Sequence, residues 1–259
     1  MRSVDCEFVP HPRPLHPTMK TISLVTGANK GIGLEICRQL LAKGHHVLLG
    51  ARDPERAREA AQSLADLGGD VDVVPIDLGD PVTFSEAREW IDKRFGKLDV
   101  LINNAGGAEN ADWQSDATNL PLDVLRRTFE LNFFSLVQLT QEMLPLLRKS
   151  DHPRIVNQSS ILGSLGEHSD PASTIADINA LAYDSSKTAV NAFTVHLAKV
   201  LRNTPFKVNS AHPGSVKTDL NPAGDLTVEE GARTAVELAT IPDEGPSGGF
   251  FHFWNNLAW

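Results

Sequence analysis

The stretch ISLVTGANKGIG, residues 22–33, joins a short apolar run to a glycine-rich turn. An amphipathic stretch over residues 32–43 follows at once, so this order predicts a strand, a tight turn and a helix. Glycine lets the backbone approach a pyrophosphate closely, and the free N–H groups and the dipole of the new helix point at that phosphate. In the first such turn of an alternating chain, the pattern favours a dinucleotide site over a plain tight turn.

The alternation of short strands and amphipathic helices continues along the chain. Strands joined by helical crossovers form a parallel sheet with helices on both faces. We therefore expect a single Rossmann-type, doubly wound α/β domain over residues 19–259, with a seven-stranded parallel sheet. The expected strands are residues 22–26, 46–49, 71–76, 100–103, 154–158, 207–211 and 249–254, and the expected helices are residues 32–43, 54–67, 81–95, 122–149, 183–202 and 228–240.

Residues 1–18 differ from the rest of the chain. They contain four prolines, show no helical or strand period, and lack the apolar central stretch of a secretory signal peptide. We interpret them as a flexible N-terminal extension. Because the regular pattern opens at Met19, the sequence leaves open whether the native chain starts at Met1 or at Met19.

The composition excludes several classes of protein. The chain has 259 residues, 41% of them hydrophobic, and a net charge of −9, which argues against nucleic acid or an anionic membrane as the main partner. No apolar run approaches the ~20 residues of a membrane span. Two cysteines, Cys6 and Cys37, form no CxxC pair, so we expect no disulfide scaffold, no metal site and a reducing, cytoplasmic location.

The end of the second expected strand bears on the choice of cofactor. A carboxylate there would bind the adenosine ribose of NAD, whereas an arginine suits the 2′-phosphate of NADP. Ala51 and Arg52 follow this strand, and Lys30 in the glycine turn lies on the same side. Two cations near one phosphate favour NADP(H) over NAD(H), unless both are merely solvated surface residues. Asp53 fits a helix N-cap, with Pro54 at the first helical position.

Tyr183 and Lys187 lie four residues apart at the start of an amphipathic stretch. This spacing places them on one helix face. A free tyrosine has a pKa of ~10, and a nearby ammonium group lowers that pKa by stabilising the phenolate. The pair therefore suits general acid–base catalysis, although the same spacing occurs by chance in many helices.

Six motifs occur in order at the expected strand ends and helices: TGxxxGxG (26–33), NNAG (103–106), Asn132, SS (159–160), YxxxK (183–187) and PG (213–214). In this combination the chain resembles the short-chain dehydrogenases/reductases over roughly residues 20–254. The resemblance implies that Tyr183 donates a proton to a substrate carbonyl, and that Lys187 holds the nicotinamide ribose. It also implies that Ser160, rather than Ser159, polarises the carbonyl.

The resemblance implies further roles. Asn132 would hold a water for proton relay, and its flanks Leu131, Phe133 and Phe134 suggest that it is buried rather than on a helix surface. Asp77 would bind the adenine amino group, and the segment around Pro213 would cover the nicotinamide. Together with the glycine turn and Arg52, the candidate cofactor-binding residues are Gly27, Asn29, Lys30, Gly31, Ile32, Gly33, Arg52, Asp77, Leu78, Asn104, Ala105, Gly106, Tyr183, Lys187, Pro213, Gly214, Val216 and Thr218.

The chain departs from the commonest family pattern before the tyrosine. Ser160 and Tyr183 are 23 positions apart, about ten more than in the usual family member, and the extra residues fall within residues 161–181, which we call the insertion. A longer segment at this place resembles the carbonyl reductase branch, which is NADPH-dependent and reduces ketones, aldehydes and quinones. The insertion precedes the helix that usually builds the family's dimer interface, so we leave the oligomeric state open between monomer and homo-oligomer. Trp113, Leu162 and Leu220 would line a fairly apolar substrate pocket, or simply pack.

The predicted function is NADP(H)-dependent reduction of a small-molecule carbonyl to an alcohol, with Tyr183 as proton donor. Two alternatives stay open. The same groups could serve an alcohol dehydrogenase working in the oxidative direction. The chain could also be a NADP(H)-binding regulatory sensor with this fold and little catalysis, although it retains Ser160, Tyr183 and Lys187.

Overall fold

The computed structural model describes residues 20–259. The expected extension over residues 1–18, the choice between Met1 and Met19, and Cys6 all lie outside this range. No helix of the described part is long and apolar enough to cross a membrane. Within the same range, no three His, Cys, Asp or Glu side chains lie together as metal ligands would.

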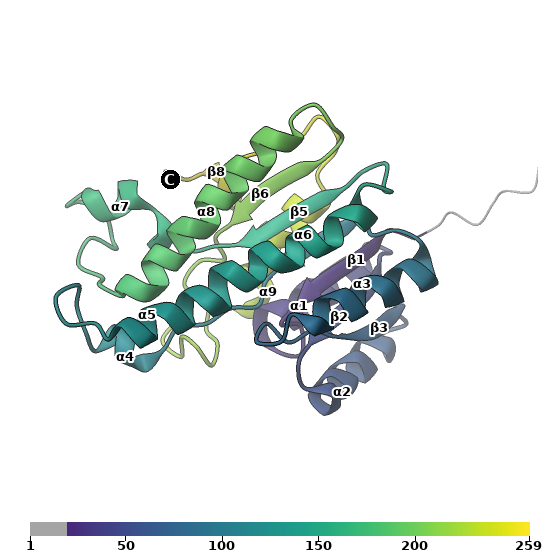
Figure 1. The fold of residues 1–259 in the computed structure, drawn as a ribbon, viewed down its shortest axis with the longest axis horizontal. Coiled ribbons are helices and arrows are strands. Elements are labelled where there is room, and N and C mark those ends of the chain that lie inside the picture. The colour runs from purple at the N-terminus through teal and green to yellow at the C-terminus, as the bar shows by residue number, and fades with distance from the viewer. Residues whose placement is uncertain (1–19) are drawn as a thin grey trace, which may run out of the picture.

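A single twisted sheet forms the centre of the molecule (Figure 1), and within residues 20–259 it has eight strands in the order β3-β2-β1-β4-β5-β6-β7-β8. The first seven pair in parallel, as expected, and β8 pairs antiparallel to β7. The strands are β1 (Ile22–Thr26), β2 (His46–Ala51), β3 (Val71–Pro75), β4 (Val100–Asn103), β5 (Arg154–Gln158), β6 (Lys207–Ala211), β7 (Phe250–His252) and β8 (Asn255–Asn256).

The eighth strand corrects the prediction of seven. The expected strand over residues 249–254 ends early because the chain reverses at Phe253 and Trp254, which have φ values of 45° and 65°. Positive φ at both central positions is the pattern of a type I′ two-residue hairpin turn, which favours glycine, asparagine or aspartate. Neither residue is a glycine, asparagine or aspartate, so the sequence carries no signal for this hairpin.

Helices cover both faces of the sheet, which confirms the prediction. Val25 of β1 faces one core with α1 and α9, and its neighbour Leu24 faces the other core with α3 and α6. This double burial explains why strands such as β2 and β4 carry apolar residues on both faces. The helices are α1 (Gly31–Ala42), α2 (Pro54–Ala65), α3 (Val82–Phe95), α4 (Asn110–Trp113), α5 (Leu122–Phe129), α6 (Ser135–Leu147), α7 (Leu165–Ser169), α8 (Leu181–Leu201) and α9 (Val228–Ala239).

The long helix expected over residues 122–149 is divided in the structure. A π-helical turn, η1 (Glu130–Phe134), separates α5 from α6, and the N–H of Ser135 bonds the carbonyl of Glu130 five residues back. The Ser135 hydroxyl also donates to that carbonyl at 2.9 Å. Such turns are common at functional sites, and this one carries Asn132.

The chain order reverses between β1 and β4, which neighbour each other in the sheet although β2 and β3 intervene in sequence. In open α/β sheets, ligands bind in the crevice outside the carboxyl ends of the strands at such a switch point. Most of the expected site residues follow one of the strands β1 to β6, so they gather along this one edge.

Candidate active site

The glycine turn lies at the carboxyl end of β1, where its backbone is shaped by the absence of side chains. Gly27 and Gly31 have φ values of 63° and 55°, which L side chains rarely adopt. A Cβ on Gly33 would lie 2.4 Å from the Gly27 carbonyl oxygen. A Cβ on Gly31 would instead enter a gap whose nearest atom, the Thr218 methyl, is 4.0 Å away. The turn therefore lines open space beside the N-terminus of α1, which fits a pyrophosphate.

A hydroxyl that the sequence did not single out braces this turn. Thr26 Oγ1 accepts hydrogen bonds from the backbone N–H groups of Asn104 and Ala105, both at 3.0 Å. The Asn104 side chain returns a bond to the Thr26 carbonyl at 2.8 Å. The structure thus brings the predicted residues Asn104 and Ala105 against the glycine turn, although they are nearly 80 positions away in sequence.

Lys30 and Arg52, the two cations expected at the 2′-phosphate of the cofactor, have different surroundings in the structure. Lys30 donates to the Asp219 carboxylate at 2.5 Å, so the turn is linked to the loop that follows β6. Arg52 is exposed at the end of β2, and forms no ion pair with any residue from 20 to 259. The Asp53 carboxylate accepts from the N–H groups of Glu55 and Arg56, which confirms its expected role as the N-cap of α2.

The remaining predicted cofactor residues lie along the same edge. Asp77 follows β3, and its carboxylate accepts from the Gly79 N–H at 3.0 Å, so it shapes its own turn. Gly214 has a φ of 87°, and a Cβ there would lie 2.4 Å from a methyl of Leu226. Val216 forms an isolated bridge with Leu226, which closes the loop that carries Thr218.

The three groups expected to be catalytic meet where β5 approaches α8. Ser160 follows β5 and is 8% exposed, while Tyr183 and Lys187 lie on the first turns of α8. The Lys187 ammonium lies 5.6 Å from the centre of the Tyr183 ring and donates to the Gln158 carbonyl at 2.8 Å. The Trp113 ring, 47% exposed, lies 6.2 Å from the Tyr183 ring.

The electrostatics of Tyr183 differ from the expectation. Burial raises the pKa of Tyr183 to about 12, and a hydrogen bond with Ser160 opposes the rise. The lowering that Lys187 was expected to cause is not seen, because burial dominates and the ammonium bonds a backbone carbonyl. Burial also lowers the pKa of Lys187 to about 8. At neutral pH the phenol therefore keeps its proton, as a proton donor must.

Asn132 is 1% exposed, so the helix-surface alternative is wrong for it. Its amide donates to the Gly107 carbonyl at 2.8 Å and to the Ser186 hydroxyl at 3.0 Å, and its carbonyl accepts from the Gly107 N–H at 2.9 Å. It thus ties the segment after β4 to α8. The flanking argument for its burial fails, because Leu131 and Phe134 are themselves exposed; the π-helical turn buries Asn132 instead.

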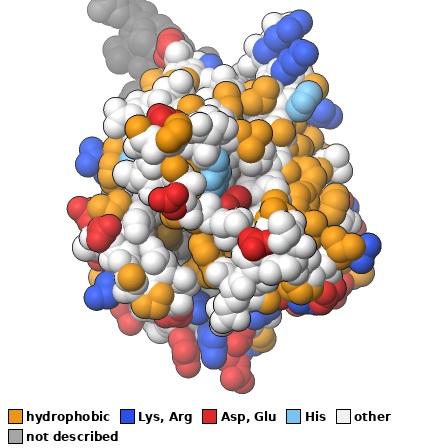
Figure 2. Space-filling view, turned by 90° about the vertical axis from the view of Figure 1, so that its left-hand side faces the viewer, with side chains coloured by type: hydrophobic (Ala, Val, Ile, Leu, Met, Phe, Trp, Pro, Cys, Tyr) orange, Lys and Arg blue, Asp and Glu red, His pale blue; other side chains and the backbone are white. Residues whose placement is uncertain are grey.

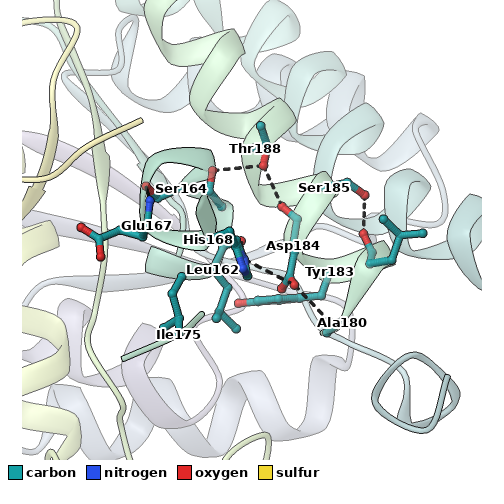
Figure 3. A network of polar contacts seen from close by, with 12 residues as sticks. Leu162, Ser164, Glu167, His168, Ile175, Ala180, Tyr183, Asp184, Ser185 and Thr188 are labelled. Carbon is teal, nitrogen blue, oxygen red and sulfur yellow. Dashed lines mark hydrogen bonds and ion pairs between the residues drawn. The ribbon is translucent and has the colours of Figure 1, made fainter. Parts of the chain in front are cut away.

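The expected insertion folds into short helices beside α8. Residues Ile161–Gly163 form a 3₁₀ turn, η2, and α7 follows with Ser164 as its N-cap. Asp184, next to Tyr183, points toward His168 of α7 and toward Ala180 (Figure 3). Burial raises the pKa of Asp184 to about 6. The insertion is therefore held against the start of α8 by the contact between His168 and Asp184.

Apolar side chains gather around a hollow on the face that carries α4 and α7 (Figure 2). Of the three residues expected to line a substrate pocket, Trp113 lies beside Tyr183, and Leu162 lies in the 3₁₀ turn that directly follows Ser160. Leu220 is largely exposed on the loop after β6. The structure thus supports an apolar surround for the phenol on the side of α4 and the insertion.

Known proteins similar to this chain are members of the family that its motifs resemble. The chain matches the short chain dehydrogenase family over residues 21–227. Salutaridine reductase from Papaver bracteatum is 34% identical over 305 aligned positions, covering 94% of this chain and 97% of that protein. Carbonyl reductase (NADPH) 3 from Mus musculus is 33% identical, covering 86% and 92%. The structure of NADPH-bound carbonyl reductase from chicken fatty liver has a TM-score of 0.81 at 30% identity, covering 93% and 99%.

The alignment with salutaridine reductase is longer than the 259 residues of this chain. That enzyme therefore has segments with no counterpart here. The alignment nevertheless covers 94% of this chain.

Proposed function

Because the chain belongs to the short-chain dehydrogenase family, we propose that it reduces the carbonyl group of a ketone, an aldehyde or a quinone with NADPH. NADPH, when bound, supplies a hydride to the carbonyl carbon. Tyr183 donates a proton to the carbonyl oxygen, so that the C=O group becomes CH–OH. The relatives named as salutaridine reductase and carbonyl reductase support this reaction class.

The observation that carries the proposal is the meeting of Ser160, Tyr183 and Lys187 at the carboxyl edge of β5. A phenol with a pKa of about 12 is fully protonated at neutral pH and becomes a donor only when negative charge develops beside it. The Ser160 hydroxyl, beside that phenol, provides a second donor to the same oxygen. Lys187, 5.6 Å from the ring, stabilises the phenolate that remains after proton transfer.

The preference for NADPH rests on the end of β2. Arg52 is exposed there and unpaired among residues 20–259, while Asp53 is occupied as a helix cap. The position therefore offers a cation rather than a free carboxylate to the adenosine ribose, which favours a 2′-phosphate. The mouse relative is named as an NADPH enzyme, and the chicken enzyme was solved with NADPH bound.

The substrate we propose is a small apolar carbonyl compound. Trp113 presents an exposed ring beside the phenol, and aromatic surfaces of this kind bind planar or apolar groups. We expect aromatic ketones and quinones to react better than short polar aldehydes.

We further propose that the protein works in the cytoplasm.

The test is the loss of reduced-cofactor absorbance with NADPH and NADH in parallel, across a panel of quinones, aromatic ketones and aldehydes. Tyr183→Phe removes the proton donor and should lower kcat by roughly 100- to 10,000-fold. NADPH affinity, measured by fluorescence, should stay unchanged in that variant. Turnover mainly with NADH would contradict the cofactor preference. Binding of NADPH with no turnover on any carbonyl would favour the regulatory sensor, and turnover only from alcohols would favour the oxidative direction.

A further inference from the structure

A buried carboxylate contacts the backbone of the proposed proton donor. Asp112 lies on α4 and is 1% exposed. One of its oxygens accepts from the Ala182 N–H at 2.9 Å, and the other accepts from the Tyr183 N–H at 2.8 Å. These are the short distances of charge-assisted hydrogen bonds, and they join segments 70 residues apart.

The two N–H groups are those that a helix normally satisfies with its own N-cap side chain. In α8 the N-cap is Ala180, which has no side-chain oxygen to offer. Ala182 and Tyr183 are the second and third residues of the helix, the positions that an N-cap side chain bonds. Asp112 therefore supplies from outside the cap that α8 lacks.

The Asp112 carboxylate is stabilised by the N-terminus of α8, while the nearby Asp184 carboxylate repels it. Among residues 20–259, no lysine, arginine or histidine forms an ion pair with it. A buried carboxylate without a cation is costly unless its oxygens are bonded. The two N–H groups and the positive end of the α8 dipole meet that need, which makes the contact specific for the first turn of α8.

The segment around Asp112 is held against α8 at a second point. Gly107, five residues earlier, is bonded on both sides by Asn132, whose amide also reaches Ser186 of α8. The neighbouring Trp113 ring lies 6.2 Å from the Tyr183 ring. The segment that runs from β4 to α4 thus contacts Tyr183, the residue proposed to donate the proton, through both Asp112 and Trp113.

We propose that Asp112 is a positioning residue for the reaction, which fixes the backbone of Tyr183 relative to the end of β4. The inference rests on the proposed function, since it assigns Asp112 an effect on proton donation. A reacting group displaced by about 1 Å can lose roughly 100-fold in rate. Asp112 acts through Tyr183 and touches neither substrate nor cofactor.

The first test compares Asp112→Asn with Asp116→Asn. Both remove one negative charge from the same segment, but Asp116 is exposed and bonds only its own turn. An asparagine at 112 can accept from one N–H and turns its NH₂ group toward the other. We expect kcat to fall roughly 10- to 100-fold in Asp112→Asn, with the NADPH dissociation constant unchanged and Asp116→Asn equal to the wild type.

Three readouts separate positioning from a merely structural role. The solvent isotope effect on kcat should rise in Asp112→Asn, because proton transfer from a displaced phenol becomes slower. In the Tyr183→Phe background, Asp112→Asn should cause no further loss in single-turnover rate, because there is no phenolic proton left to position. Because Tyr183 is the chain's one tyrosine, nitrogen-15 tyrosine labelling gives a single amide signal, whose hydrogen exchange should accelerate in Asp112→Asn.

An equal loss of rate in both backgrounds, or a loss confined to NADPH affinity, would overturn the proposal. So would an unchanged amide signal of Tyr183. A wild-type chain that reduces no carbonyl would overturn the proposed function, and the positioning role with it. The labelled amide would then still show whether the Asp112 cap exists, so the two failures are distinguishable.

Discussion

The two ends of the crevice are built in opposite ways. At the cofactor end, Gly27, Gly31 and Gly33 follow one another within a single turn, and their backbone angles shape the site. At the proposed catalytic end, Tyr183 is contacted by Ser160 and Asp112, which come from two other segments. The backbone of one end is shaped by three nearby glycines, with Asn104 and Asp219 bracing it from a distance, whereas the other end is assembled entirely from separate segments.

This contrast predicts two kinds of failure. A change in the local turn should alter the affinity for the cofactor and leave the chemical step intact once cofactor is bound. A change among the assembled side chains should slow the chemical step and leave cofactor affinity intact, as proposed for Tyr183 and Asp112. Three further substitutions test how far this division holds.

The largest effect is expected from Gly33→Val. Its Cβ would lie 2.4 Å from the Gly27 carbonyl oxygen and 2.5 Å from the Asn104 amide, so the turn must shift. Strain of this kind costs about 1–3 kcal/mol, so we expect NADPH to bind up to roughly 100-fold more weakly by fluorescence titration. The matched control is Ala42→Val at the exposed end of α1. A fall in kcat at saturating NADPH, with affinity retained, would break the division between the two ends.

A smaller effect is expected from Arg52→Ala. Losing one exposed charge-assisted contact to a 2′-phosphate should weaken NADPH binding about tenfold. NADH has no such phosphate, so its affinity should stay the same, and the ratio of the two dissociation constants is the measurement. Arg56→Ala, one turn into α2, serves as the control for surface charge. An equal loss of affinity for NADPH and NADH would show that Arg52 does not determine the preference between them.

The smallest effect concerns stability at the catalytic end. The pKa of Asp184 is about 6 in the folded chain, against 3.8 as its ordinary value. The folded state therefore binds the proton more tightly, and this stabilising contribution is complete below pH 3.8 and lost as pH rises through 6. Between pH 5 and pH 8 the wild type should lose about 1 kcal/mol relative to Asp184→Asn.

Urea unfolding of both proteins at the two pH values measures this difference. Asp177→Asn removes the same charge from an exposed position of the insertion and should show no pH-dependent difference from the wild type. An equal gap between Asp184→Asn and the wild type at pH 5 and pH 8 would mean that the carboxyl is not destabilised by burial. The expected result would instead show that the buried carboxylate of Asp184 lowers the free energy of unfolding at neutral pH.

The same contrast explains what the sequence could reveal. The strands β1, β4, β5 and β6 have the predicted limits, and β1 and β4 are short, largely apolar runs followed directly by glycine or asparagine. The glycine turn and the N-cap at Asp53 were likewise readable, since their signals lie within a few residues. These features depend on local backbone chemistry, which a sequence displays directly.

What the sequence did not reveal depends on distant partners. Asp112 gives no local sign that it caps a helix 70 residues later, and Thr26 gives none that it binds the backbone after β4. The sequence does not predict the rise in the pKa of Tyr183, because spacing shows that Lys187 is near but not how deeply the phenol is buried.

The hairpin at Phe253 and Trp254 is a local feature that the sequence also does not predict, because neither residue type favours positive φ.

The π-helical turn at Glu130–Phe134 offsets the rotational phase of α6 from that of α5 by one residue. It contains one residue more than a regular turn, so α5 can present its face to α8 while α6 presents its own to α3. Deleting a single residue there, such as Leu131, would restore an unbroken α-helix and turn one half by about 100° against the other. This turn is therefore the place where the length of the helix cannot change by one residue without misaligning one of its two neighbours.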